Sequence, residues 1–427
     1  MTPGNVTGMK VSLVSEHASP LALLGGVDAG GQNVHVAALA RALAALGAEV
    51  VVHTRRDDPA LPRRVQFAPG VVVDHVDAGP PEPIPKDALA GWMDAFADDL
   101  VDQWATDRPD VVHAHFWMSG IAAVDAGDRA RVPVALTYHA LGAEKRRHQG
   151  RSDTSPPGRV AVEAWLARAV DHVVATTAHE ARAVSAMGAL DGDVSIVPCG
   201  VDLQRFQAPG RRLLPPSGRT RIACVSRLVP RKGTADVIRA LVDLPDAELL
   251  VAGGPPQAML HEDREAVALR RIADEVGVAD RVRFLGAVDR ADVPALLRSV
   301  DVVCCCPWYE PFGLVAVEAM ACGVPVVATR VGGLAETVVD RRTGALVPPR
   351  DPAAIGAAVR WVVGDERRHA RLADAACARA HAYDWSRIAA RTASVYEQMV
   401  AAGRRHCTEP IPPWYEAPAD ELVGGTW

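Results

Sequence analysis

The sequence of 427 residues has no apolar run that approaches the roughly 18 residues needed to cross a bilayer. It also shows no secretory signal, because the short apolar run Val11–Val14 follows Lys10 in the manner of a first β-strand. We therefore expect a cytoplasmic protein without an integral-membrane partner. A chain of this length is expected to form two domains of about 200 residues.

An excess of basic residues is missing as well. The formal net charge is −6, with 23% charged and 49% hydrophobic residues. This balance is typical of a globular protein, and it argues against a dedicated nucleic-acid binder or a protein held on anionic lipid. Specific anions such as phosphates can still bind locally.

The eight cysteines lack the spacing of a metal site. Cys304, Cys305 and Cys306 are consecutive in an apolar run that ends at Pro307. In a strand, Cys305 would point away from its two neighbours, so a buried strand explains this run better than a zinc site. We expect the cysteines to be reduced.

Other metal motifs are weak. His113 and His115 alternate on a predicted strand and share one face, but the sequence shows no third ligand beside them. The one D-x-D candidate for a metal-bound diphosphate, Asp191-Gly192-Asp193, has the composition of an ordinary turn. We predict no metal and no required cofactor.

Short β-branched runs alternate with amphipathic helical patterns in two successive series, which predicts an α/β fold with parallel sheets covered on both faces. The expected architecture is two Rossmann-like, doubly wound domains facing each other across a cleft. The predicted strands of the first series are Lys10–Ser15, Glu49–Thr54, Val71–Val76, Asp110–His115, Val132–Thr137, His172–Thr176 and Val194–Val197. Those of the second are Arg221–Val225, Glu248–Ala252, Val282–Leu285, Val302–Cys306, Val324–Thr329 and Ala345–Val347.

Prolines and glycines in Gln207–Gly218 interrupt both periodicities and predict the domain junction there. We therefore assign residues 1–207 to a first domain and 208–385 to a second. Residues 386–405 are expected to form a helix that crosses back to the first domain, and the proline-rich residues 406–427 an irregular tail.

A glycine-rich turn, Gly25–Asn33, follows the first strand and opens the first long helix. Its glycines, among them Gly30 and Gly31, let the backbone approach a ligand, and the helix N-terminus attracts an anion. The spacing is not GxGxxG, and no acidic residue clearly ends the second strand, so a dinucleotide site is disfavoured. A ligand-free tight turn stays the alternative.

The second domain repeats this arrangement with cations. Ser226–Gly233 follows a predicted strand and precedes a helix, and it carries Arg227 and Lys232. Two cations beside a helix N-terminus suit a diphosphate. The alternative is a pair of ordinary solvated charges.

The most informative stretch is Trp308–Ala321, which carries Glu310 in a loop and Glu318 in the following helix. Both lie after a buried strand, at the edge where open α/β sheets bind ligands. Carboxylates accept hydrogen bonds from vicinal sugar hydroxyls. The helix around Glu318 is almost wholly apolar, so its carboxylate is expected to be buried and to need partners.

Several separated motifs now agree: Glu310 to Glu318, Arg227–Gly233, Pro198–Asp202 and Gly332–Glu336. Together they resemble family 4 of the retaining GT-B glycosyltransferases over nearly the whole chain. Two further segments resemble the mycothiol-type inositol-phosphate N-acetylglucosaminyltransferases and, more distantly, sucrose-phosphate synthases. These segments are Asp28–Val34 and His113–Gly120.

The resemblance implies a nucleotide-sugar donor, with UDP favoured and GDP an alternative. It assigns the donor diphosphate to Arg227 and Lys232, the ribose hydroxyls to Glu318 and the sugar 3-hydroxyl to Glu310. Backbone N–H groups for the sugar and phosphate are expected from Phe312, Gly313 and Leu314, and the base is expected near Val288. In the first domain Gly30 and Gly31 are expected at the diphosphate, and His139 at the donor sugar. The predicted catalytic residues are His139, Arg227, Lys232 and Glu310.

The acceptor side departs from the mycothiol type. Lys86 and Arg159 match two of its phosphate-binding positions, but Phe116 replaces a tyrosine and Ala140 a threonine. Two hydroxyl donors are thus missing, which at roughly 1 kcal/mol per hydrogen bond weakens a phosphate site by more than tenfold. We predict a related, non-phosphorylated small-molecule acceptor. The predicted acceptor residues are Asn33, Lys86, Phe116, Ala140, Lys145 and Arg159.

In this family the leaving diphosphate is thought to take the acceptor's proton on the face of attack, so the protein's task is to stabilise the charge that grows on the diphosphate. Alternatives stay open: an S- or O-glycosyltransferase of a lincosamide-like natural-product pathway that uses a GDP-sugar, a non-hydrolysing epimerase, and a catalytically silent sugar-nucleotide-binding protein. A homodimer also stays open.

Overall fold

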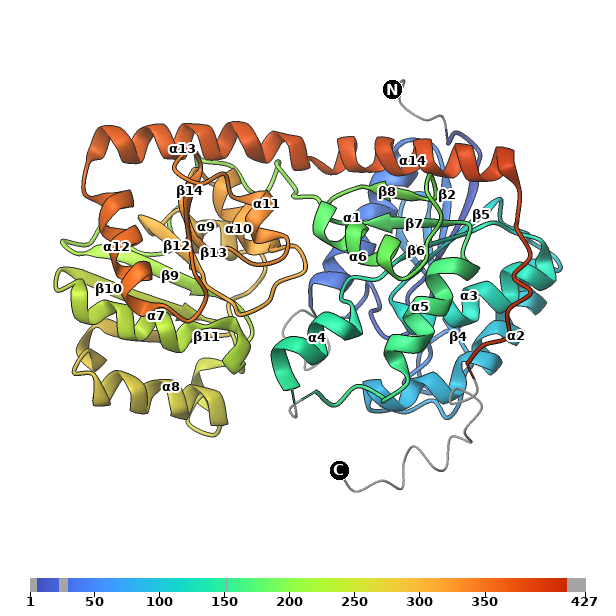
Figure 1. Ribbon diagram of the computed structural model, residues 1–427, viewed down its shortest axis with the longest axis horizontal. Helices are drawn as coiled ribbons and strands as arrows, with labels where there is room; N and C mark the ends of the chain where they lie inside the picture. The colour runs from blue at the N-terminus through green and yellow to red at the C-terminus, as the bar shows by residue number, and fades with distance from the viewer. Residues whose placement is uncertain (1–5, 23–29, 151–152, 413–427) are drawn as a thin grey trace. The chain divides into compact units, whose positions relative to one another are not determined.

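The computed structural model describes residues 6–22, 30–150 and 153–412 (Figure 1). The predicted turn residues Gly25–Ala29 and most of the predicted tail lie outside the described residues. The chain forms two compact units: the first unit is residues 1–198 with 385–427, and the second unit is residues 199–384. Each unit contains one sheet.

The first unit has an eight-stranded sheet in the order β3-β4-β2-β1-β5-β6-β7-β8. Its strands are β1 (Lys10–Val14), β2 (Glu49–Arg55), β3 (Arg64–Ala68), β4 (Val71–Val76), β5 (Val111–His115), β6 (Val134–Thr137), β7 (His172–Ala175) and β8 (Val194–Ile196). Its helices are α1 (Gly31–Ala45), η1 (Lys86–Trp92), α2 (Met93–Trp104), α3 (Trp117–Ala130), α4 (Gly142–Gln149), α5 (Arg159–Ala169), α6 (Ala178–Ala186) and α14 (Trp385–Ala402).

All pairings in this sheet are parallel except β3 with β4. Strand β3 was not predicted, because it is a half-exposed edge strand of five residues without a strong apolar run. The tight turn at Gly70, with a φ of 72°, returns the chain into β4 and makes the pairing antiparallel.

The second unit has a six-stranded, wholly parallel sheet in the order β11-β10-β9-β12-β13-β14. Its strands are β9 (Thr220–Val225), β10 (Ala247–Ala252), β11 (Val282–Gly286), β12 (Val302–Cys305), β13 (Val326–Thr329) and β14 (Gly344–Val347). Its longer helices are α7 (Thr234–Ala240), α8 (Arg264–Glu275), α10 (Leu314–Ala321), α12 (Pro352–Val363) and α13 (Glu366–Ala380), and its short α-helices are α9 (Val293–Leu297) and α11 (Leu334–Thr337).

Alternate side chains of these strands pack into two separate cores, one on each face of the sheet. Cys304 and Cys306 pack in one core, and Cys305 packs against the other. The prediction that Cys305 points away from its neighbours is thus confirmed, and burial raises the pKa of its thiol above the usual range. Because a strand with both faces covered must be apolar throughout, this pattern explains the continuous β-branched runs of the sequence.

The boundary between the two units lies earlier in the sequence than the predicted junction. Val201 and Phe206, which the proline and glycine pattern placed in the first domain, pack in a core of the second unit. Val201 also donates its N–H to the carbonyl oxygen of Tyr383 at 2.7 Å. The boundary therefore falls at Pro198, because core packing rather than loop composition decides it.

Helix α14 belongs to the first unit although it follows the whole second unit in sequence. Its buried residues, among them Ile388 and Tyr396, share a core with Val36 and Leu39 of α1. The Tyr396 hydroxyl reaches Nδ1 of His113 on β5 at 2.7 Å. A buried tyrosine needs such a partner, so α14 completes the sheet's covering.

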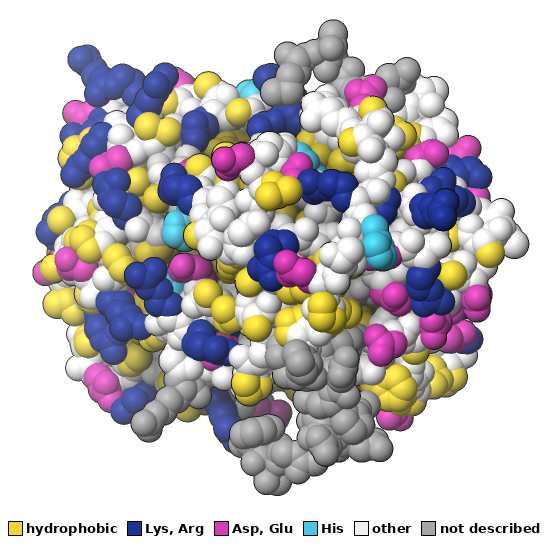
Figure 2. Space-filling view, turned by 45° about the vertical axis from the view of Figure 1, so that its right-hand side comes forward, with side chains coloured by type: hydrophobic (Ala, Val, Ile, Leu, Met, Phe, Trp, Pro, Cys, Tyr) yellow, Lys and Arg dark blue, Asp and Glu magenta, His cyan; other side chains and the backbone are white. Residues whose placement is uncertain are grey.

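None of the helices in the described part of the chain is long and apolar enough to cross a membrane. On the face drawn in Figure 2, lysine and arginine side chains are interspersed with aspartate and glutamate. Mixed charges of this kind solvate a surface without creating a field of one sign.

Candidate active site

The second unit places two of the predicted donor residues in contact. Lys232 ends the short turn Pro230–Lys232 between β9 and α7, and its Nζ forms an ion pair with the Glu310 carboxylate. Both side chains are largely buried. Strands β9 and β12 are neighbours in the sheet, so the loops that follow them meet at its carboxyl edge. Arg227, from the same loop as Lys232, is exposed.

A glycine holds the Lys232 turn against the strand beside it. Gly233 has a φ of 71°, and a Cβ there would lie 1.9 Å from the Cys306 carbonyl oxygen. Only glycine fits this left-handed conformation at such a short distance from backbone. Close packing on the Cys306 backbone therefore explains why the motif Arg227–Gly233 ends in glycine.

The loop that carries Glu310 is fixed by the later motif Gly332–Glu336. Gly333 donates its N–H to the Glu310 carbonyl oxygen at 3.0 Å. Gly332 has a φ of 44°, and a Cβ there would lie 2.1 Å from the same oxygen. These two glycines let the β13–α11 loop pack on the Glu310 backbone, and they position its carboxylate.

Helix α10 begins immediately after this loop. Gly313 is its N-cap, with a φ of 94°, and a Cβ there would meet Leu334 Cδ2 at 2.4 Å. Phe312 is buried and packs edge-on against Tyr383 at a ring distance of 5.9 Å. The N–H groups of Gly313 and Leu314 have no acceptor within the helix, because the first turn leaves them unpaired. They can serve a sugar hydroxyl or a phosphate.

Glu318 lies one turn into α10 and is 2% exposed. Its Oε1 pairs with Nη2 of Arg290, whereas the buried Oε2 has no hydrogen-bond partner. A buried carboxylate oxygen without a donor costs free energy that a ligand hydroxyl can recover. The expectation that Glu318 is buried is met, and its free acceptor fits the ribose assignment.

Arg290 was not among the residues predicted from the sequence, and the structure adds it to this site. Arg290 follows β11 in the loop after Val288, and its guanidinium lies 4.9 Å from the centre of the Phe206 ring. Val288 itself is partly buried against the core. Two hydrogen bonds join the loop after β11 to the loop after β10. Gly253 donates its N–H to Gly286 O at 2.8 Å, and Ala287 donates its N–H to Pro255 O at 3.0 Å. The signal for Arg290 in the sequence was a cation in the loop that follows a strand.

In the first unit, the start of α1 is held by its own side chains. Gly30 is the N-cap, and its N–H donates to Asn33 Oδ1 at 3.0 Å. Asn33 Nδ2 donates in turn to the Ser19 carbonyl oxygen at 3.0 Å, and the residue is 3% exposed. Asn33 therefore caps the start of α1 and joins it to Ser19, whereas Gly31 is exposed at the first helical position.

Two of the predicted acceptor residues, Lys86 and Arg159, lie against the ring of a third, Phe116. Lys86 Nζ lies 3.9 Å and Arg159 Cζ 4.9 Å from the centre of this buried ring. Phe116 holds a left-handed φ of 87°, which is uncommon outside glycine and marks a constrained position before α3. The structure thus brings Lys86, Phe116 and Arg159 together, as the resemblance implied.

Two of the predicted acceptor cations, Arg159 and Lys145, are paired within the protein. Arg159 donates through Nε to Glu163 at 2.7 Å and through Nη2 to the Ala140 carbonyl oxygen at 2.6 Å. Lys145 Nζ lies 3.0 Å from Asp153. Arg159 is almost completely buried in this pair. Their charges are therefore already compensated before an acceptor binds.

His139 follows β6 with a left-handed φ of 60°, and its Nε2 lies 3.0 Å from Nδ1 of His115 at the end of β5. Its ring also meets His35 of α1 edge-on at 4.9 Å. Burial lowers the pKa of both His115 and His139 well below the usual value. His139 is therefore neutral at neutral pH, and it suits hydrogen bonding to a sugar better than carrying a proton.

These buried histidines predict a pH-dependent stability. Burial lowers the pKa of His35 and His53 to about 4 and that of His113 to about 3. The unfolded chain binds protons near pH 6.5 that the folded chain rejects, so stability is complete above this pH and declines as the pH falls from 6.5 toward 4. Each histidine contributes up to about 1.4 kcal/mol per pH unit.

Urea unfolding measured at a series of pH values between about 7.5 and 5 checks this slope. In a His53→Gln variant the slope should decrease by about one proton, because His53 is a single buried histidine on β2. Equal slopes in the two proteins would show that His53 is not held neutral by burial.

Family comparisons agree with the fold. Residues 29–205 match the family described as Glycosyltransferase Family 4, and residues 210–379 match Glycosyl transferases group 1. The chain belongs to glycosyltransferase family 4 and has the GT-B fold of two parallel-sheet α/β domains; it is a glycosyltransferase.

Individual relatives and solved structures that resemble this chain are named more narrowly than the family. D-inositol 3-phosphate glycosyltransferase 2 of Catenulispora acidiphila is 38% identical over 410 residues, covering 92% of this chain and 95% of that protein. The D-inositol 3-phosphate glycosyltransferase of Streptomyces coelicolor is 36% identical over 427 residues, covering 93% of each. Sucrose-phosphate synthase from Thermosynechococcus elongatus has a similar structure, with a TM-score of 0.83 and 30% identity over 92% of this chain and all of that one. Anabaena HepE, crystallised with UDP and glucose, shares the fold at 22% identity and a TM-score of 0.71, over 92% of this chain and 100% of that one.

Proposed function

We propose that the protein is a retaining glycosyltransferase that moves a sugar from a nucleoside-diphosphate sugar, with UDP favoured as the nucleotide, to a small non-phosphorylated acceptor. The observation that carries the donor part is Glu318, whose buried Oε2 lacks a partner. Lys232 and Glu310 lie in the same unit as a ready cation and carboxylate for the diphosphate and the sugar. A fold neighbour crystallised with UDP supports the choice of UDP.

The proposed reaction forms the bond from the acceptor to the anomeric carbon on the face that the diphosphate leaves. The bond between that carbon and the diphosphate oxygen breaks, and the acceptor's proton passes to the leaving diphosphate. Negative charge therefore grows on the diphosphate, where Lys232 and Arg227 stabilise it. His139, held neutral, donates or accepts a hydrogen bond at the donor sugar.

The acceptor proposal rests on charge in the first unit. An acceptor phosphate needs cations with free donors, but Arg159 and Lys145 are each paired with a carboxylate. Phe116 and Ala140 contribute no side-chain hydroxyl. A neutral polyol or a related small molecule avoids the cost of breaking two ion pairs.

A thermal-shift screen of UDP-, GDP-, ADP- and dTDP-sugars tests the donor, because a bound ligand raises the melting temperature in proportion to the logarithm of its concentration. The selected donor is then incubated with inositol or inositol phosphate, and release of the nucleoside diphosphate is measured. We expect UDP-sugars to stabilise the protein, and inositol phosphate to be used at least about tenfold less efficiently than the neutral acceptor.

The outcomes separate the parts of the proposal. Efficient use of inositol phosphate would overturn the acceptor assignment and leave the donor assignment standing. Selective stabilisation by a GDP-sugar would overturn the choice of nucleotide. Tight donor binding without transfer to any acceptor would favour a silent sugar-nucleotide-binding protein.

A further inference from the structure

A buried carboxylate, that of Glu16, lies beside the predicted acceptor residues of the first unit. Glu16 follows β1 in the loop at the carboxyl edge of the sheet and is 1% exposed. Its Oε1 lies 2.5 Å from Nδ1 of His17, and its Oε2 accepts a hydrogen bond from the hydroxyl of Ser119 on α3. The Glu16 N–H also donates to this hydroxyl oxygen, at 3.1 Å. Both oxygens of the carboxylate are therefore occupied within the protein.

His17 connects this carboxylate with the predicted acceptor residues. Its ring meets Phe116 edge-on, with 5.0 Å between the ring centres, and Lys86 Nζ lies 3.9 Å from the centre of the same Phe116 ring. Burial raises the pKa of the Glu16 carboxyl, but the charges and hydrogen bonds around it, led by those of His17 and including the charge of Lys86, lower it further. Glu16 is therefore ionised at neutral pH.

Every predicted acceptor cation thus has a carboxylate that compensates its charge. The pairs are Arg159 with Glu163, Lys145 with Asp153, and Lys86 with Glu16. A phosphate on the acceptor would add a negative charge to this balanced group. Because a buried carboxylate is little screened by water or salt, the phosphate and the carboxylate would repel each other.

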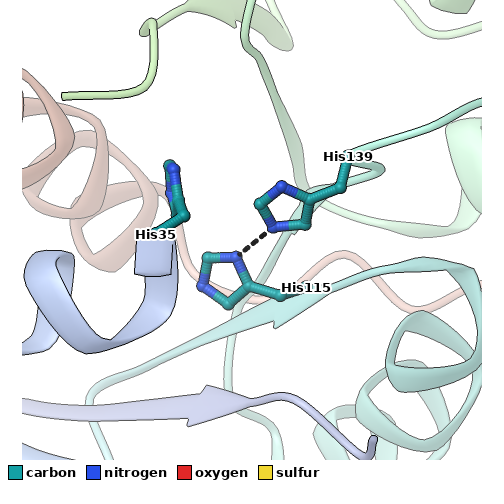
Figure 3. A group of neighbouring side chains, drawn as sticks. All are labelled: His35, His115 and His139. Carbon is teal, nitrogen blue, oxygen red and sulfur yellow. Dashed lines mark hydrogen bonds between the residues drawn. The ribbon is translucent and has the colours of Figure 1, made fainter. Parts of the chain in front are cut away.

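Three nearby histidines do not change this balance. His35, His115 and His139 lie together, and Nε2 of His139 is hydrogen-bonded to Nδ1 of His115 (Figure 3). Burial lowers the pKa of His35 to about 4 and that of the other two well below the usual value. All three are therefore neutral at neutral pH. The charge of Lys86 makes a smaller contribution at His139, so this cation lies near the position predicted for the donor sugar.

Building on the proposed function, we propose that Glu16 is a specificity-determining residue of the acceptor site: its buried negative charge excludes phosphate-bearing acceptors in favour of uncharged hydroxyl compounds. Because His17 and Ser119 already occupy both carboxylate oxygens, Glu16 acts on the acceptor through its charge rather than through a hydrogen bond. The alternative is that Glu16 only ties the loop after β1 to α3.

Calorimetric titration of the full-length protein with D-inositol 3-phosphate, and separately with inositol, distinguishes the two in the presence of UDP. A pH of about 8.5 keeps an ordinary imidazole neutral, so that His17 adds no charge. In Glu16→Gln the affinity for the phosphate should rise at least about tenfold, because a like charge is removed while the side chain keeps its volume. The affinity for inositol should stay within about threefold of the wild type, since an uncharged ligand is not repelled.

Two control variants separate charge from structure. Ser119→Ala removes the hydrogen bond to Glu16 but keeps the charge, so the affinity for inositol phosphate should not rise. Asp74→Asn removes a buried carboxylate on β4 that pairs with Arg63, outside the Phe116 group, and should also leave this affinity unchanged. The proposal is overturned if Glu16→Gln gives no rise, if inositol gains as much as its phosphate, or if either control gives the same rise.

A second variant covers the case in which Glu16→Gln does not fold, as checked by circular dichroism. Glu16→Met combined with Ser119→Ala replaces both hydrogen-bonding partners by apolar side chains, and the same rise in phosphate affinity is expected. Stabilisation by UDP-sugars is a separate measurement. Its absence would refute the proposed donor and leave the Glu16 result standing, whereas an unchanged phosphate affinity would refute only the role of Glu16.

Discussion

Glu318→Gln loses most of the stabilisation that a nucleoside-diphosphate sugar gives the wild-type protein; this is the largest effect on binding that we expect. The substitution keeps the side chain's volume but removes a charged acceptor that is 2% exposed and has one oxygen without a donor. Hydrogen bonds to a charged group contribute about 1.5–3 kcal/mol each, so the donor's Kd should rise on the order of 100-fold. Calorimetric titration with the donor measures it.

Glu248→Gln is the control for this variant. Glu248 also pairs with an arginine, Arg221 Nε at 2.5 Å, and belongs to the same unit. It lies near the amino end of β10, at the opposite edge of the sheet from the Glu318 group. Its donor affinity should equal that of the wild type. A Glu318→Gln protein that binds the donor normally would show that Glu318 does not hold the ribose.

Lys232→Ala should reduce kcat by about 10²–10³, because it removes a preorganised cation from the point where negative charge grows during transfer. The KM for the donor should change much less, since the charge on the diphosphate is larger in the transition state than in the bound donor. Steady-state release of the nucleoside diphosphate gives both constants.

Arg231→Ala is the matched variant, because Arg231 is the neighbouring cation of the same turn but makes no predicted donor contact. It should keep kcat within about threefold of the wild type, as expected for a surface charge outside the site. If Lys232→Ala raised only KM, Lys232 would contribute uniform binding of the donor rather than stabilisation of the transition state.

The contact between Lys232 and Glu310 is an example of site geometry that can be predicted from the sequence. The two residues are 78 positions apart, yet each follows a strand of the same parallel sheet. Because loops at the carboxyl ends of such strands converge, strand order makes their contact foreseeable. The apolar runs that predict the strands are strong for the same reason, since both faces of the sheet are covered.

The features that were missed depend on packing in three dimensions. Edge strand β3 has a weak apolar signal, and the domain boundary follows the core contacts of Val201 and Phe206 rather than the prolines after them. His35, His115 and His139 come from three elements whose side chains meet only when α1 covers the sheet. Nothing in the local sequence around any one of them predicts the other two.

The return of helix α14 to the first unit has a consequence for the order of folding during synthesis. The second unit is one continuous segment, residues 199–384, and its core is complete once Asp384 has left the ribosome. All eight strands of the first unit's sheet are translated earlier, but its core still lacks Ile388 and Tyr396. The middle of the chain can therefore reach its native packing before the beginning does. The nascent first unit keeps α1 and the His113 ring uncovered until α14 has been translated.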